Sequence, residues 1–184
     1  DLGRPVKAVD GSGLSMSDTP ENQKKYPQSK RRKKGCGFPE MRIVALFSLA
    51  TGVLLQYATG SRKAAERPLF RLLWGALEAG DVLLADRGFC SLADFHLLLV
   101  RGIDCVMRLH QRRAAGVRVI KKLGRGVTLV EWAKSKVRPK WLTHEQWAAI
   151  PDAFRVRHIT FNVDVKGFRT TRIIRCVKLA PAPR

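Results

Sequence analysis

Two aspartates stand where apolar, strand-like segments meet polar or glycine-bearing ones. Residues 6–16 (VKAVDGSGLSM) are typical of a strand that enters a Gly-rich turn, with Asp10 toward its end. Asp86 directly follows residues 81–85 (DVLLA), a short apolar strand of the kind that is buried on both faces. In an open α/β sheet, ligands bind at the carboxyl ends of the strands. If these two strands are neighbours, the two carboxylates converge.

Paired carboxylates at such an edge suit phosphodiester cleavage by two metal ions. The ions are held about 3.5–4 Å apart, where one activates the attacking oxygen and the other stabilises the leaving oxygen. Mg²⁺ in these sites binds one or two carboxylates together with waters and substrate phosphate. The sequence therefore makes Asp10 and Asp86 candidate catalytic residues and candidate ligands of Mg²⁺ (or Mn²⁺).

Aspartates next to glycines also have purely structural roles. The segments around Asp10 and Asp86 could be no more than a turn and a strand-to-helix loop. Asp18 is a rival for the first catalytic position. In the segment DTPEN, however, Asp18 or Thr19 suits the N-cap of a short helical turn with Pro20 at its first position, and capping is the interpretation that the pattern favours.

Strands and helices that would position these residues follow one another in a recognisable order. The alternation in the second half requires crossovers and a partly parallel sheet, beside which the first three strands can form an antiparallel meander. This order predicts an α/β fold, an RNase H-like mixed sheet with flanking helices. The expected strands cover 6–16, 41–50, 53–59, 81–85 and 103–109, and the expected helices cover 62–79, closed by Gly80, and 91–101, capped by Ser91.

The character of the sequence changes after His110. A short helix capped by Thr143 is expected at 143–149. Alternating residues predict a strand at 154–165, with a bulge near Arg157-His158, that pairs with a second strand at 172–179. We therefore expect residues 1–110 to form the N-terminal part of an RNase H-like core. Residues 111–184 are expected to form a β-rich insertion region.

The charge is the outlying property of the composition. Thirty-five Lys and Arg against 15 Asp and Glu give a formal net charge of +20. Such an excess repels itself in the folded state, so a polyanionic partner such as DNA explains it better than a generally basic, soluble protein does. The apolar stretch 41–58 contains polar residues and splits at a turn, which favours two strands over a membrane span. Four cysteines without metal-ligand spacing are typical of reduced thiols in the cytoplasm.

Basic residues in two loops and beside one aspartate are candidate phosphate contacts. A solvated loop is the alternative for residues 30–34. Arg87 could either pair with Asp86 or contact a phosphate. The candidate DNA-binding residues are Lys30, Arg31, Arg32, Lys33, Lys34, Arg87, Arg112, Arg113, Lys121 and Lys122.

An ordered set of motifs carries a resemblance to a known family. The chain resembles bacterial DDE transposases of the insertion-sequence 4 type. VDGS followed by DTPEN, with ADRGF well downstream, is a specific combination, whereas each piece alone is weak. The matching segments are VDGSGLSMSDTPEN (9–22), GFPEMRIVALFSLATG (37–52), LLADRGFCSLADF (83–95) and GFRTTRII (167–174).

The resemblance implies an RNase H-like core interrupted by a β-rich insertion. It also implies Mg²⁺-dependent cleavage at transposon ends and strand transfer into target DNA, with Asp10 as the first catalytic acid and Asp86 as the second. From the family we expect a homodimer that binds double-stranded DNA. We also expect it in the bacterial cytoplasm, associated with the nucleoid and not with a membrane.

One family feature is missing from the sequence. The third acid of the family is a Glu in a Tyr-Arg-Glu-Lys type motif on a helix that follows the insertion. The only glutamates after Asp86 are Glu131 and Glu145, and neither has those neighbours. We therefore expect a fragment truncated before the last catalytic helix, which alone is inactive or nearly so.

Two other functions fit parts of the pattern. A non-catalytic DNA-binding remnant of a mobile element would keep the basic surface without the chemistry. An RNase H-like nuclease acting on RNA–DNA hybrids is disfavoured by the missing third acid and by the DTPEN segment. An in-frame Tyr-Arg-Glu-Lys helix in the downstream genomic sequence would favour the transposase, and a stop codon would favour the remnant.

Overall fold

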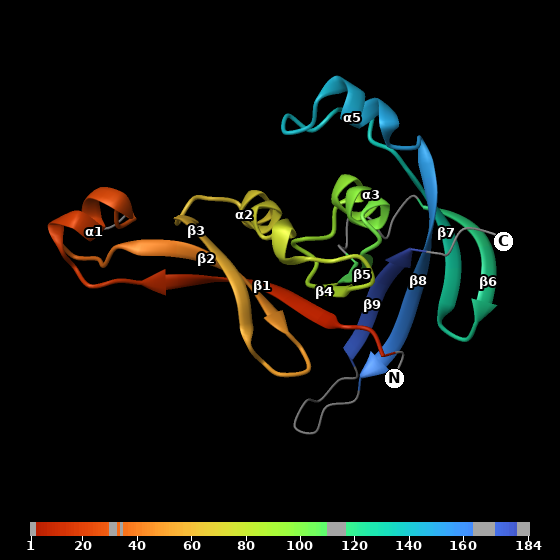
Figure 1. Cartoon of the computed structure of the whole chain (residues 1–184), viewed down its shortest axis with the longest axis horizontal. Helices are drawn as coiled ribbons and strands as arrows, with labels where there is room; N and C mark the ends of the chain where they lie inside the picture. Colours follow the sequence, from red (N-terminus) through yellow and green to blue (C-terminus); the bar gives the residue numbers. More distant parts are fainter. Residues whose placement is uncertain (1–2, 30–32, 34, 110–116, 164–171, 180–184) are drawn as a thin grey trace. The chain divides into compact units, whose positions relative to one another are not determined.

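In a computed structural model the chain forms two compact units, Asp1–Asp81 and Val82–Arg184 (Figure 1). The structure describes residues 3–29, 33, 35–109, 117–163 and 172–179, and from residue 161 onward it describes the backbone alone. Each unit has its own strands and its own buried apolar side chains.

The first unit is built on an antiparallel meander. Its strands β1 (Val6–Ser15), β2 (Glu40–Ser48) and β3 (Leu54–Ser61) lie in the order β3-β2-β1. The short connection between β2 and β3 passes through Gly52, whose φ of 70° is readily adopted only by glycine. The predicted meander is confirmed. The apolar stretch 41–58 lies in two strands, and among the described residues no helix is long and apolar enough to cross a membrane.

A short helix, α1 (Pro20–Lys25), separates β1 from β2. The Thr19 hydroxyl accepts a hydrogen bond from the Asn22 backbone N–H at 3.2 Å, so Thr19 is the N-cap, and Pro20 occupies the first helical position. Asp18 instead accepts a bond from the Gln23 side chain at 2.7 Å. The DTPEN segment therefore starts a helix, as its sequence predicts.

The helix predicted at 62–79 is shorter than expected. α2 (Glu66–Leu72) is followed by one 3-10 turn, η1 (Trp74–Ala76). α2 starts two residues before Pro68, because a proline is tolerated in the first turn, where its missing N–H would have no partner. Gly80 does not cap the helix; it lies in a later turn with a φ of 97°. α2 packs on β2 and β3.

A buried ion pair ties the start of β1 to the last residue of the first unit. Asp81 is 2% exposed, and its carboxylate lies 2.7 Å from the Lys7 ammonium. The same carboxylate accepts the Glu78 backbone N–H, and Lys7 also donates to the Ala76 carbonyl. A buried charge is stable only when paired and hydrogen-bonded, and both conditions are met here.

The second unit begins with a parallel strand pair. β4 (Val82–Ala85) and β5 (Asp104–Arg108) are parallel and are connected through α3 (Leu92–Val100), as the sequence predicts. Ser91 is the N-cap residue of α3, but its side chain makes no capping hydrogen bond, contrary to the prediction. Gly102 follows the helix with a φ of 76°.

The rest of the second unit is rich in antiparallel strands. Its sheet has the order β4-β5-β9-β8-β7-β6, and the pairs from β5 to β6 are antiparallel. The bulge predicted near Arg157-His158 is absent, since β8 pairs in regular register with both neighbours; the register shifts lie in the β6–β7 pair. The four strands are β6 (Arg118–Gly124), β7 (Val127–Ala133), β8 (Ala153–Val163) and β9 (Arg172–Leu179).

A short helix, α5 (His144–Ala149), lies between β7 and β8. The Thr143 side chain accepts the Gln146 backbone N–H at 3.1 Å, and the Gln146 side chain accepts the Thr143 backbone N–H at 3.0 Å. This reciprocal capping box satisfies two donors at the helix start. The predicted cap is confirmed.

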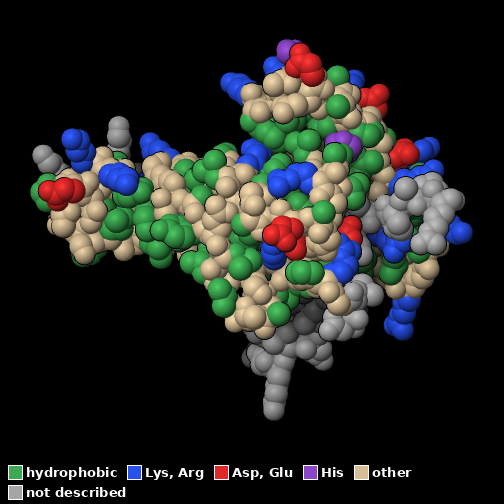
Figure 2. Space-filling view, viewed as in Figure 1, with side chains coloured by type: hydrophobic (Ala, Val, Ile, Leu, Met, Phe, Trp, Pro, Cys, Tyr) green, Lys and Arg blue, Asp and Glu red, His purple; other side chains and the backbone are tan. Residues whose placement is uncertain are grey.

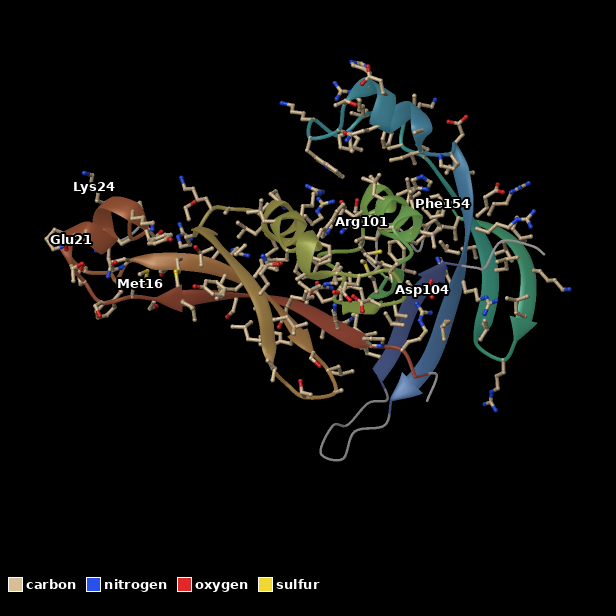
Figure 3. The ribbon with its side chains drawn as sticks, viewed as in Figure 1. Met16, Glu21, Lys24, Arg101, Asp104 and Phe154 are labelled. Atoms are coloured by element: carbon tan, nitrogen blue, oxygen red, sulfur yellow. The ribbon has the colours of Figure 1, made fainter. Side chains whose placement is uncertain are left out.

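An aromatic cluster forms part of the core of the second unit. Trp132 is 4% exposed and lies edge-on to Phe95 of α3. Phe154 points from β8 toward α3, where His96 lies 6.3 Å away between ring centroids (Figure 3). The Trp132 indole N–H donates to Nε2 of His158 at 3.0 Å. Because that nitrogen is an acceptor, His158 is neutral in this arrangement.

Replacing Gly126 with alanine should destabilise the second unit by about 1–3 kcal/mol. Gly126 has a φ of 74°, and an added Cβ would collide with the Thr160 carbonyl oxygen. The Thr160 N–H also donates to the Gly126 carbonyl at 2.7 Å, which holds the two backbones close together. Urea unfolding measures the loss. Gly124→Ala is the matched control: its Cβ meets nothing within 4 Å, so its free energy of unfolding should change by about 0.5 kcal/mol or less. Equal losses would contradict the close approach at Gly126.

Acidification should weaken the Trp132–His158 pair. Burial lowers the pKa of His158, and burial followed by the nearby Lys134 charge lowers the pKa of His96. Just below pH 6.5, the ordinary pKa of histidine, the unfolded chain therefore binds more protons than the folded chain does. The free energy of unfolding should consequently fall as the pH drops through about 6.5. His158→Gln should flatten the curve between about pH 7.5 and 5.5. His144→Gln, at an exposed position on α5, should not.

Candidate active site

Asp10 is the fifth of the ten residues of β1, in the middle of the strand and not toward its end as predicted. The strand continues because β2 pairs with it along its whole length after residue 6, with Asp10 opposite Ala45. The Asp10 side chain is exposed, and its Oδ1 accepts the Gly11 backbone N–H at 2.8 Å. The carboxylate is thus held through one oxygen on the surface of the first unit.

The opposite face of β1 is occupied by a different carboxylate. A Cβ on Gly11 would lie 2.8–2.9 Å from the Glu66 side chain, so glycine allows Glu66 to cross the strand closely. Glu66 accepts a bond from the Arg42 guanidinium at 2.5 Å, and Arg42 pairs in register with Gly13. Because successive side chains alternate across a strand, Glu66 and Asp10 lie on different faces of β1. Glu66 is therefore a structural partner of Arg42 and not a second carboxylate for Asp10.

Asp86 directly follows β4, at the carboxyl end of a parallel strand. Its Oδ1 accepts the Gly88 backbone N–H at 2.7 Å, and its carbonyl accepts the Phe89 N–H at 3.3 Å. Phe89 is fully buried and anchors the turn, whereas Asp86 and Arg87 are exposed. Asp86 therefore lies on a turn directly after a strand, as its sequence predicts, at the end of the strand where α/β sheets bind ligands.

Asp10 belongs to the first unit and Asp86 to the second. Each carboxylate has the same local arrangement, with Oδ1 bound to the backbone N–H of a nearby glycine and the side chain exposed. Their convergence on a shared pair of metal ions stays a prediction. Within the described ranges, no group of three or more His, Cys, Asp and Glu side chains is placed to hold a metal ion.

The predicted phosphate contacts fall into two groups. The described ones, Lys33, Arg87, Lys121 and Lys122, are all exposed, with Lys121 and Lys122 on β6. The others, Lys30, Arg31, Arg32, Lys34, Arg112 and Arg113, lie outside the described residues. Basic residues that the prediction omitted, among them Arg155 and Arg157, lie on β8. The alternation in FRVRHI was the signal, because it places these two arginines on one face.

Comparison with known proteins shows the family of the chain. Residues 1–172 match the model of the Transposase DDE domain family, and the chain belongs to that family. It is 28% identical over 140 residues to the transposase InsG of insertion sequence element IS4 from Escherichia coli (strain K12), an alignment that covers 76% of this chain and 32% of that protein. The chain therefore spans about a third of the length of this relative. The mixed α/β structure is compatible with the RNase H-like fold expected for the family.

A solved structure gives a weaker likeness. The crystal structure of an Endonuclease_V from Bacillus subtilis aligns with a TM-score of 0.36 and 11% sequence identity. The alignment covers 95% of this chain and 65% of that one. Similarity at this level adds nothing to the assignment of the site.

Substituting the two aspartates should leave the fold intact. Asp10→Asn and Asp86→Asn should each change the free energy of unfolding by about 0.5 kcal/mol or less, because both side chains are exposed and an asparagine oxygen can accept the same backbone N–H. Asp81→Asn is the contrasting variant. It removes the charge that pairs with Lys7 in a buried position and should cost about 1–3 kcal/mol in urea unfolding. A large loss in either exposed variant would mean that the carboxylate is structural.

Proposed function

We propose that this chain supplies two catalytic carboxylates, Asp10 and Asp86, for cut-and-paste transposition of DNA. The reaction is Mg²⁺-dependent cleavage of phosphodiester bonds at transposon ends, followed by strand transfer into target DNA. The observation that supports the proposal most directly is the exposed Asp86 carboxylate at the carboxyl end of β4, inside a Transposase DDE domain. Double-stranded DNA is then the substrate, and the net charge of +20 favours its binding.

Chemistry of the donor groups fits the metal that the family implies. Mg²⁺ (or Mn²⁺) prefers carboxylate oxygens, and two bound ions supply activation of the attacking oxygen and stabilisation of the leaving oxygen. The Gly11 and Gly88 backbone N–H groups each fix one oxygen of their aspartate. These bonds restrict the two side chains before any ligand arrives, which lowers the entropy lost on binding. Arg87, exposed beside Asp86, would contact a substrate phosphate.

We infer that catalysis needs a third carboxylate beside Asp10 and Asp86. The described residues do not supply it. Glu131 is engaged with Arg118 at 2.8 Å. Glu145 lies in the first turn of α5, where its own backbone N–H and the Thr143 hydroxyl lower its pKa, as suits a helix-start acid. Neither glutamate stands in a Tyr-Arg-Glu-Lys type motif. Residues 1–184 alone should therefore cleave DNA weakly or not at all.

Further features of the proposal follow from family membership. Residues 1–110 would belong to the catalytic core and 111–184 to an insertion, within a homodimer that holds two transposon ends. The protein would act in the bacterial cytoplasm at the nucleoid. A non-catalytic DNA-binding remnant is the second candidate, favoured by the lack of a third clustered acid among the described residues.

Mn²⁺ binding tests the two aspartates without requiring turnover. Titration of residues 1–184 with Mn²⁺, followed by electron paramagnetic resonance, should show binding that Asp10→Asn and Asp86→Asn each weaken by about tenfold or more, since even outer-shell changes cost about tenfold. Asp18→Asn removes an exposed carboxylate of the first unit and should leave binding unchanged. A loss confined to one of the two variants would disprove a shared site.

A nicking assay on duplex transposon ends tests the assignment of Asp86. Residues 1–184 should show at most weak Mg²⁺-dependent nicking, which Asp86→Asn abolishes. Robust nicking that persists in Asp86→Asn would overturn the site assignment. An RNA–DNA hybrid cut in preference to duplex ends would instead indicate an RNase H-like nuclease.

A further inference from the structure

The outward face of the β6–β7–β8 sheet in the second unit carries a basic row. Cross-strand partners share a face, and the register places Arg118 opposite Glu131 and Glu131 opposite Arg155. Two positions along, Lys121 stands opposite Leu129, and Leu129 stands opposite Arg157. Residues two apart on β7 and on β8 point the same way, and a register shift between Val119 and Lys121 brings Lys121 of β6 to the same face as Arg118.

This face is the solvent side of the sheet. The alternate residues of β7 and β8 point the other way and form core, with Val130, Trp132 and Val156 at most 4% exposed. By contrast Arg155 and Lys121 are exposed, and the Arg118 side chain is 70% exposed. Basic side chains lie at the surface over the β6–β7 hairpin (Figure 2). We call Arg118, Lys121, Arg155 and Arg157 the basic face.

Charges on the basic face are strongly one-sided. Its four cations accompany a single acid of the same rows, Glu131, which is paired with Arg118 at 2.8 Å. Arg157 is half-buried, and its Nε is buried without a hydrogen-bond partner in the described part of the chain. Lys178 of β9 occupies the register position opposite Arg157. A surface that needed only solubility would mix both signs.

Edge protection explains only part of this charge. β6 is the last strand of the sheet order, and lysines on an edge strand discourage pairing with another sheet. Arg155 and Arg157, however, lie on β8, which has β7 on one side and β9 on the other. An interior strand has no edge to protect. Edge protection therefore does not account for Arg155 and Arg157.

We propose that the basic face is a docking surface for the phosphate backbone of duplex DNA. Strands about 4.8 Å apart and residues about 3.4 Å apart along a strand give a patch roughly 10 Å by 7 Å. Successive phosphates of one DNA strand advance about 3.4 Å along the axis and also turn around it, so about two fall within that span. The guanidinium groups of Arg155 and Arg157 can each bind a phosphate through two N–H donors. The surface rests on the proposed function for its substrate, but it contacts DNA without the metal site.

Salt dependence of binding measures how many phosphates the protein neutralises. Fluorescence anisotropy of a labelled duplex with residues 1–184, in EDTA, gives the slope of log K against log salt. Lys121→Gln/Arg155→Gln should reduce the magnitude of that slope by about 1.8, because each phosphate that is no longer neutralised lowers it by about 0.9. Lys136→Gln/Lys140→Gln removes the same charge from exposed positions before α5 and should leave the slope nearly unchanged.

Controls separate this inference from misfolding and from the catalytic proposal. Arg155→Lys keeps the charge and should keep the slope. If Arg155 had a structural role instead, Arg155→Lys would not restore the wild-type slope. Wild-type residues 1–184 should bind duplex in EDTA, where no metal site can form, so a failed Mn²⁺ site leaves this result standing. Equal slope reductions in both double variants, no duplex binding at all, or tighter binding to single-stranded or double-stranded RNA would each overturn the proposal.

Discussion

Alternation of side chains across a β-strand is the constraint on which both units depend. In β1 it turns Val9 and Gly11 toward one face, which Glu66 of α2 crosses, and leaves Asp10 exposed on the other. In β8 the same alternation buries Val156 and leaves Arg155 exposed. A strand can therefore contribute to the core and to a functional surface at once, because its two faces are independent.

Rigid anchoring of exposed groups is the second common feature. Asp86 and Arg87 stand on a turn that the buried Phe89 fixes, and Asp10 stands on a strand paired on one side with β2. A catalytic carboxylate must stay near its working geometry, and packing beneath it is what restricts its motion. The buried Lys7–Asp81 pair shows the alternative use of an aspartate, in which the charge is satisfied inside and has no access to substrate.

Local signals in the sequence were good predictors where the physics is local. The Thr19 and Thr143 caps follow from side chains that bond a backbone N–H three residues away. The β4–α3–β5 crossover follows from a short apolar run and a helix between two strands. The prediction that the first strand enters a turn near Gly11 was wrong. A glycine inside a strand can allow the close approach of another side chain, here Glu66, as readily as it allows a turn.

The sequence by itself determined the ordered family motifs, the excess of positive charge and the position of Asp86 after an apolar strand, since each depends on neighbours along the chain. Only the tertiary structure decided that Asp10 lies within a strand and that Glu66 forms an ion pair with Arg42. It also decided that Arg155 shares a face of the sheet with Arg118. These facts depend on strand register. Register is set by which strands pair and how they align, and that choice is made by packing between residues far apart in the sequence.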